Sequence, residues 1–129
     1  MKVTVTETPV ISIVDDDESV REAIESLMKS VGYTAKVFPS AADFLSSENL
    51  DDTGCLILDV QMPGMSGLEL QTRLVASKCR IPIIFISAHS DADARARALD
   101  AGAVGFLQKP FSEDALLNAI NLSLGDSHK

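Results

Sequence analysis

Basic residues are scarce in this sequence, and their scarcity limits what the chain can bind. It has 11 lysines and arginines against 19 aspartates and glutamates, so its net charge is −8. A surface this acidic repels the phosphate backbone of nucleic acids. We therefore expect that this segment binds neither DNA nor RNA.

Cysteine is nearly absent as well. Cys55 and Cys79 are too few for a disulfide framework and lack the spacing of a zinc site. Cys55 opens an apolar run and is expected to be a small core residue, whereas Cys79 lies in a polar connection. Both cysteines suit a reducing compartment.

The sequence also lacks a long hydrophobic segment. Residues 1–9 alternate valine and threonine and do not form the apolar block of a signal peptide. The longest mostly apolar stretch, Ile81 to Ala88, is far too short to span a bilayer. These absences predict a cytoplasmic protein with no membrane contact. The 129 residues, 46% of them hydrophobic, are enough for one domain with a substantial core.

Short apolar runs alternate with longer amphipathic ones, which is typical of βαβ units around a parallel sheet. The helix boundaries carry recognisable signals, among them a capping box formed by Ser66 and Glu69. Predicted strands are Val10 to Val14, Thr34 to Phe38, Cys55 to Leu58, Ile83 to Ile86 and Val104 to Leu107. The first predicted helix runs from the cap Asp17 to Gly32, and its apolar stripe consists of Val20, Ala23, Ile24, Leu27, Met28 and Val31. Three further helices are predicted at Ser40 to about Ser46, Ser66 to about Ser77, and Asp91 to Ala101 before Gly102. The last helix begins at the cap Ser112, and its core residues are Leu116, Ile120 and Leu124.

Polar side chains follow four of the predicted strands, at the point where each strand ends. Asp15 and Asp16 follow the first strand and Asp59 the third, while Ser87 and Lys109 end the fourth and fifth. Sheets of this kind bind ligands beyond the carboxyl ends of their strands. A lone aspartate there is more often a helix cap, the role that we assign to Asp17. Five suitable groups at four strand ends favour a functional site instead.

The charges of these groups predict a metal ion. Three carboxylates close together repel, and Lys109 offsets only one of them. A divalent cation would bring the site near neutrality, and all-oxygen ligands favour Mg²⁺, with Mn²⁺ as a substitute. We expect Asp15, Asp16, Asp59 and the backbone carbonyl of Gln61 to hold the ion.

A site that is neutral only with metal bound is suited to receive a phosphoryl group. The transition state spreads negative charge over oxygens that Mg²⁺, Lys109 and the Ser87 hydroxyl can contact. Asp59 is then the nucleophile and forms an aspartyl phosphate.

At this point the residues resemble a known family, the receiver domains of bacterial two-component response regulators. The spacing between Asp59, Ser87 and Lys109 is similar to that of FixJ-like transcriptional response regulators. The resemblance covers about residues 9–124, flanked by an N-terminal extension (1–8) and a tail or linker start (125–129). It is carried by the segments Val14 to Asp16, Leu58 to Gly67, Ile86 to Ala88 and Lys109 to Phe111.

The resemblance implies an α/β fold, a doubly wound parallel sheet of five strands in the flavodoxin-like order 2-1-3-4-5. It also implies that a sensor histidine kinase phosphorylates Asp59, that Asp15 and Asp16 form the Mg²⁺ pocket, and that the bond between Lys109 and Pro110 is cis. Gln61 and His89 occupy positions that tune dephosphorylation in the family, although both could equally be ordinary loop residues.

The family further implies a switch. Ser87 would move to the phosphoryl group, and Phe106 would swing into the vacated space, although Phe106 could instead be a packing residue. The surface of the fourth helix, fifth strand and fifth helix would then promote a homodimer or release an output domain, which we expect to be transcriptional. The chain would catalyse only its own phosphorylation and dephosphorylation and would not otherwise be an enzyme.

Three alternatives stay open. A phosphatase of the haloacid-dehalogenase type shares the strand-end Asp, Ser and Lys but needs a second acid where Gln61 stands. A pseudo-receiver would lack a pocket residue, and no pocket residue is missing here. A stand-alone receiver without a DNA-binding output domain is the third.

Overall fold

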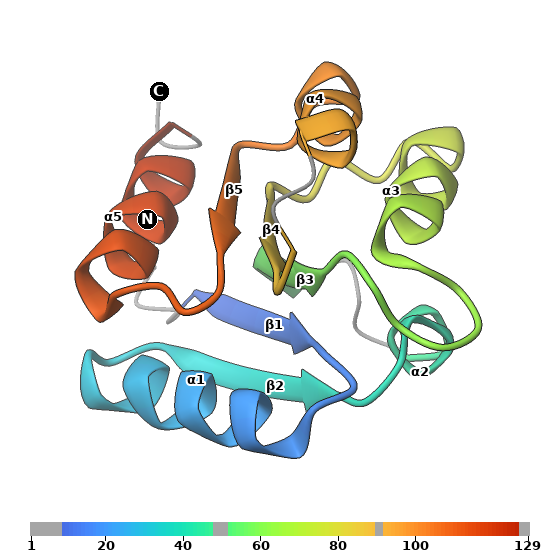
Figure 1. Ribbon diagram of the computed structural model, residues 1–129. Coiled ribbons are helices and arrows are strands. Elements are labelled where there is room, and N and C mark those ends of the chain that lie inside the picture. The colour runs from blue at the N-terminus through green and yellow to red at the C-terminus, as the bar shows by residue number, and fades with distance from the viewer. Residues whose placement is uncertain (1–8, 48–51, 90–91, 127–129) are drawn as a thin grey trace, which may run out of the picture.

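Strands and helices alternate strictly along the chain. The computed structural model describes residues 9–47, 52–89 and 92–126, and within them each strand is followed by one helix (Figure 1). The strands are β1 (Val10–Val14), β2 (Thr34–Phe38), β3 (Thr53–Asp59), β4 (Ile83–Ser87) and β5 (Gly105–Gln108). The helices are α1 (Glu18–Ser30), α2 (Ala41–Leu45), α3 (Gly67–Ala76), α4 (Ala92–Asp100) and α5 (Glu113–Asp126).

All five strands are parallel and lie in the order β2-β1-β3-β4-β5, which confirms the predicted fold class. Helices α1 and α5 cover one face of the sheet, and α2, α3 and α4 cover the other (Figure 1). Because both faces are covered, the two strands β3 and β4 are buried almost throughout. This explains why they read as continuous apolar runs rather than as alternating ones.

Two hydrophobic clusters fill the space between the sheet and its helices. The α1–α5 cluster lies under α1 and α5 and consists mainly of isoleucines, and it includes Cys55, which is buried as predicted. The α2–α3–α4 cluster lies under the other three helices and contains the phenylalanines Phe44 and Phe85. Among the described residues, no helix is long and apolar enough to cross a lipid bilayer.

The predicted helix caps are present. Asp17 accepts a hydrogen bond from the backbone N–H of Ser19, and Ser112 accepts one from Ala115. Ser66 and Glu69 form the reciprocal capping box at the start of α3. The cap at Ser40 likewise starts α2.

Three helices end in a left-handed residue. Gly32 after α1 and Gly102 after α4 have φ of 95° and 106°, as expected for glycines in this role. Lys78 adopts φ of 63° at the equivalent place after α3, although its side chain makes that conformation less favourable.

Some sequence-based boundaries are wrong by one or two residues. Strand β3 begins at Thr53 rather than Cys55, because the Thr53 hydroxyl pairs with that of Ser12 inside the sheet at 2.7 Å. On the predicted stripe of α1, Ala23 is exposed and Val31 is 46% exposed. The predicted apolar stripe is wider than the face of the helix that contacts the sheet. The predicted first residue of α4, Asp91, lies outside the described residues.

Candidate functional site

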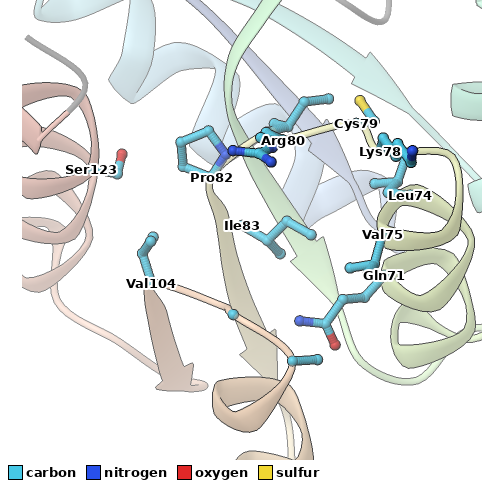
Figure 2. A pocket seen from close by; sticks show the side chains of 13 residues that line it. Gln71, Leu74, Val75, Lys78, Cys79, Arg80, Pro82, Ile83, Val104 and Ser123 are labelled. Atoms are coloured by element: carbon cyan, nitrogen blue, oxygen red, sulfur yellow. The ribbon is translucent and has the colours of Figure 1, made fainter.

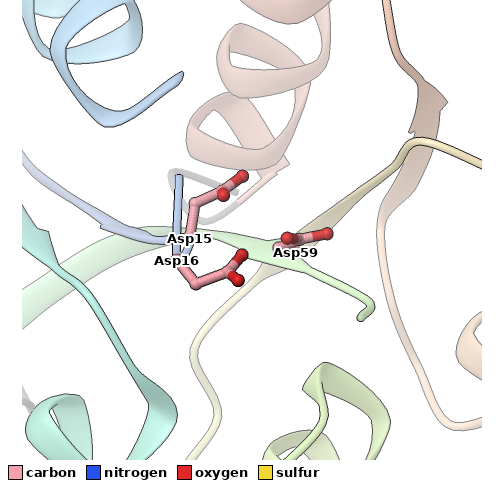
Figure 3. Close-up of side chains that lie close together, drawn as sticks. All are labelled: Asp15, Asp16 and Asp59. Atoms are coloured by element: carbon pink, nitrogen blue, oxygen red, sulfur yellow. The ribbon is translucent and has the colours of Figure 1, made fainter. Parts of the chain in front are cut away.

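Three carboxylates meet at the carboxyl ends of β1 and β3. Asp15 and Asp16 follow β1, Asp59 is the last residue of β3, and one oxygen from each lies within 4.8 Å of the others. Figure 3 shows the pair from the β1 end beside the Asp59 side chain. The parallel pairing of β1 with β3 brings the strand ends together although they are far apart in sequence.

Asp15 is completely buried, and its polar groups are all held. Its backbone N–H donates to the carbonyl of Phe38 at 3.2 Å, and its own carbonyl accepts from the Arg21 guanidinium at 2.8 Å. The carboxylate accepts from the backbone N–H of Asp17 at 2.9 Å and from Lys109 Nζ at 3.0 Å. Asp15 is therefore a fixed point of the site, whereas Asp16 beside it is exposed to solvent.

Asp59 is only 4% exposed, and its surroundings disfavour the ionised form. Burial raises the pKa of Asp59 to about 6, with a further rise from the charge of Asp15, while Lys109 opposes the shift. Lys109 Nζ lies 3.7 Å from one carboxylate oxygen, and the backbone N–H of Gln61 donates to the other at 3.4 Å. The carboxylate is thus incompletely neutralised by the protein.

The donor set fits a hard divalent cation. Three carboxylates against one ammonium leave a surplus of negative charge, which adds to the effect of burial in raising the pKa of Asp59. All the available ligand atoms are oxygens, as Mg²⁺ prefers, and Asp16 leaves one side of the cluster open to water. The Gln61 side chain is exposed on the following loop.

Ser87, at the end of β4, is buried and already bonded. Its hydroxyl donates to the His89 carbonyl at 3.0 Å and accepts from the His89 N–H at 3.1 Å. The Ser87 carbonyl accepts from the backbone N–H of Lys109 at 2.7 Å, so the ends of β4 and β5 are joined beside the acids. Lys109 is followed by Pro110 through a cis peptide bond, which confirms the expectation.

Phe106 on β5 is half-buried and packs on the α2–α3–α4 cluster. Its ring centroid lies 6.1 Å from that of Phe85 on β4, with the rings tilted by 33°. Phe106 therefore stands on the strand next to Ser87, on the face covered by α4.

The loop after Asp59 is held tightly under the site. The Gly67 N–H donates to the Val60 carbonyl at 2.9 Å, which places the start of α3 against the backbone of Asp59. A Cβ atom at Gly67 would overlap the carbonyl oxygen of Asp59. Glycine is required here for close approach and not for an unusual backbone angle.

Two polar contacts near these elements were not anticipated from the sequence. Arg21 reaches back from α1 to the Asp15 carbonyl, and the buried Gln71 on α3 donates from Nε2 to the Ala98 carbonyl at 3.0 Å. An arginine four residues after a helix cap is the only signal that the sequence offered for the first contact, and it is a weak one.

A hollow of about 660 Å³ lies elsewhere, at the opposite end of the strands. It is bounded by the end of α3, the start of β4 and the turn before β5, as Figure 2 shows with Val75, Pro82 and Val104. The acidic cluster is not part of it. The carboxylates therefore lie at an open edge rather than at the bottom of this cavity.

Comparison with known proteins shows the family to which this fold belongs. The response regulator receiver domain family matches residues 11–121 of the chain. The chain belongs to this family.

Individual response regulators are similar to this chain in sequence and in structure. The receiver is 50% identical over 115 residues to the response regulator protein TodT of Pseudomonas putida, covering 89% of this chain and 51% of TodT. It is 39% identical to the transcriptional regulatory protein FixJ of Azorhizobium caulinodans over 117 residues, covering 91% of this chain and 56% of FixJ. The crystal structure of FixJ-N superposes with a TM-score of 0.84 at 34% identity, covering 93% of this chain and 96% of that one. The chain spans about half the length of the curated relatives it matches.

Proposed function

We propose that this receiver accepts a phosphoryl group on Asp59 from a sensor histidine kinase in the cytoplasm. The observation that carries the proposal is the convergence of Asp15, Asp16 and Asp59 within 4.8 Å, beside Lys109. We propose that the receiver domain extends over residues 9–124.

The transfer needs an ionised Asp59. One carboxylate oxygen attacks the phosphorus of a donor phosphohistidine, a P–O bond forms as the P–N bond breaks, and the donor imidazole leaves with the electron pair. The pKa of about 6 keeps most of the Asp59 carboxyl ionised above pH 7. Lys109, now 3.0 Å from Asp15 and 3.7 Å from Asp59, would contact an oxygen of the incoming group.

Asp15, Asp16, Asp59 and the backbone carbonyl of Gln61 would hold Mg²⁺, for which Mn²⁺ would substitute. When bound, the ion supplies positive charge to the phosphoryl oxygens and offsets the repulsion among the carboxylates. The acidic surplus of the cluster supports this assignment, because Lys109 alone leaves the cluster negative.

The hydroxyl of Ser87 would act as the first part of the switch. To bond a phosphoryl oxygen it must give up one or both of its bonds to the His89 backbone, which releases the connection to α4. Phe106, half-buried beside Phe85, would then move toward the space that Ser87 leaves. Both residues are proposed here as the two-state element.

The output would be read from the surface of α4, β5 and α5. Its exposed apolar side chains include Leu99 and Leu122, which are 40% and 70% exposed, and these suit a phosphorylation-dependent homodimer. Since relatives include a transcriptional regulatory protein and are about twice as long, we propose that the output is transcriptional and lies in another domain. The receiver itself would bind no nucleic acid and would catalyse only its own phosphorylation and dephosphorylation.

The test is phosphorylation by acetyl phosphate and Mg²⁺, followed by the mass of the intact protein. We expect a gain of one phosphoryl group that is lost in EDTA and in Asp59→Asn. Asp43, which is exposed on α2, provides a matched control. Asp43→Asn makes the same chemical change away from the site, so this variant should still gain one phosphoryl group. A wild type that stays unmodified with acetyl phosphate and with histidine kinases would overturn the proposal.

The dimer is tested separately by sedimentation of the phosphorylated and unmodified forms. We expect a larger species only after phosphorylation. Identical profiles, with no partner that distinguishes the two forms, would remove the α4–β5–α5 surface from the proposal.

A further inference from the structure

The Arg21 side chain holds a backbone group in the peptide unit between the two acids that follow β1. Strand β1 ends at Val14, so the carbonyl of the next residue, Asp15, points beyond the strand pairing. Arg21, in the first turns of α1, donates to that carbonyl at 2.8 Å. The contact is partly buried, where a polar group without a partner is costly.

The held carbonyl belongs to the peptide unit that joins Asp15 to Asp16. A peptide unit is planar, so fixing its oxygen also fixes the direction in which the chain enters Asp16. Asp15 is held at its other polar groups by Phe38, Asp17 and Lys109, whereas Asp16 is exposed. Two peptide units therefore place Asp16: the following one, whose N–H at Asp17 donates to the Asp15 carboxylate, and this one, which Arg21 holds.

We infer that Arg21 is a positioning residue that fixes the Asp15–Asp16 peptide so that both carboxylates and Asp59 reach one divalent cation. The inference rests on the proposed function, because it concerns the same metal site. It assigns Arg21 no contact with the ion or with the phosphoryl group.

The charge of Arg21 and its hydrogen bond to the Asp15 carbonyl have opposite effects on the affinity for Mg²⁺. A guanidinium near the cluster repels a divalent cation, so removal of the charge alone would tighten Mg²⁺ binding. Loss of the bond to the carbonyl would instead loosen the cluster and weaken binding. The sign of the change in affinity therefore separates the two roles.

The experiment compares Arg21→Met and Arg21→Lys with the wild type by calorimetric titration with MgCl₂. Methionine keeps the apolar stem but cannot donate, and we expect its Kd for Mg²⁺ to rise about tenfold, as for other residues that orient metal ligands. Lysine keeps a donor and a charge and should restore most of the affinity. Lys29→Met, which removes a charge from the same helix at an exposed residue paired with Glu25, should leave the Kd within about twofold.

Urea unfolding in EDTA provides the second readout. If Arg21→Met lowers stability but binds Mg²⁺ as tightly as the wild type, or more tightly, Arg21 is only a structural link and the inference is wrong. If Arg21→Met does not fold, Arg21→Gln, whose side chain is too short to reach the carbonyl, carries the same expectation. A wild type that binds no Mg²⁺ would instead overturn the proposed function, so the two failures are distinguishable.

Discussion

Helices α5 and α4, on opposite faces of the sheet, bury different kinds of side chain. On one face, α5 buries the large residues Leu116 and Ile120. On the other face, α4 buries only Ala94 and Ala98. A fully buried leucine or isoleucine contributes about 1.5–3 kcal/mol, and a methyl group contributes much less.

The difference shows which helix can respond to the site. Helix α4 depends on few apolar contacts, supplemented by the Gln71 amide that bonds the Ala98 carbonyl. The aromatic pair Phe85 and Phe106 lies on the same side of the sheet as α4. Weakly packed elements move at the lowest free-energy cost. Helix α4 is thus suited to carry a signal, and α5 to hold the fold.

The largest effect should come from removing a large side chain of the better packed helix, α5. We expect Ile120→Ala to lower the free energy of unfolding by about 2–5 kcal/mol, because it removes a fully buried side chain and leaves a cavity. Ala98→Gly on α4 should cost about 1 kcal/mol, mostly through helix propensity. Urea denaturation of both variants measures the difference, and equal losses would contradict the comparison.

The α2–α3–α4 side has one tight point, where α3 begins against Asp59. Gly67→Ala should cost about 1–3 kcal/mol and slow phosphorylation, since the new methyl group overlaps the Asp59 carbonyl. Gly105→Ala is the matched control, because a Cβ atom there meets Ile84 at an ordinary 3.6 Å. A Gly67→Ala variant as stable and as reactive as the control would contradict this prediction, because the backbone would then move away from the new methyl group at little cost.

At the edge between the faces, Asp59 makes stability depend on pH. Its pKa in the folded chain is about 6, above the ordinary 3.8, so the folded state holds the proton more tightly. The stability that this adds is fully present below pH 3.8 and is lost as the pH rises through about 6.

In metal-free buffer we expect the wild type to lose on the order of 1 kcal/mol relative to Asp59→Asn between pH 5 and pH 7.5. Urea denaturation of both proteins at each pH gives this difference, and Mg²⁺ should abolish it for the wild type. A difference that does not change with pH would mean that Asp59 titrates normally.

The smallest effect concerns the helix ends. Lys78→Gly should stabilise the protein by about 0.5–1 kcal/mol, because glycine adopts a φ of 63° without strain. The reverse change at α1, Gly32→Ala, should destabilise by a similar amount. Thermal unfolding measures both changes in stability, and an unchanged Lys78→Gly variant would contradict the prediction for the end of α3.

Most of the sheet could be predicted from sequence because strong local signals mark it. The apolar runs of β3 and β4, the caps at Asp17 and Ser66, and the strand-end acids all depend on short-range patterns. The convergence of Asp15 with Asp59 followed from parallel pairing alone.

Other features depend on contacts that no local pattern records. The bond from Arg21 to a backbone carbonyl and that from Gln71 to α4 need the three-dimensional arrangement of the helices. Val31 fits the helical period of α1 yet is 46% exposed, and it lies one residue past the end of the helix at Ser30. The sequence does not predict the start of β3, because Thr53, which pairs with the Ser12 hydroxyl inside the sheet, is a polar residue.

The ammonium of Lys109, 3.0 Å from Asp15, comes directly after strand β5. While a ribosome is still making the second half of the chain, the Asp15 carboxylate lacks the ammonium that it contacts in the folded domain. Because domains fold as units once their segments are available, a truncated or stalled product cannot assemble this arrangement. A chain that stops before Lys109 would therefore leave the buried Asp15 carboxylate without its ammonium partner.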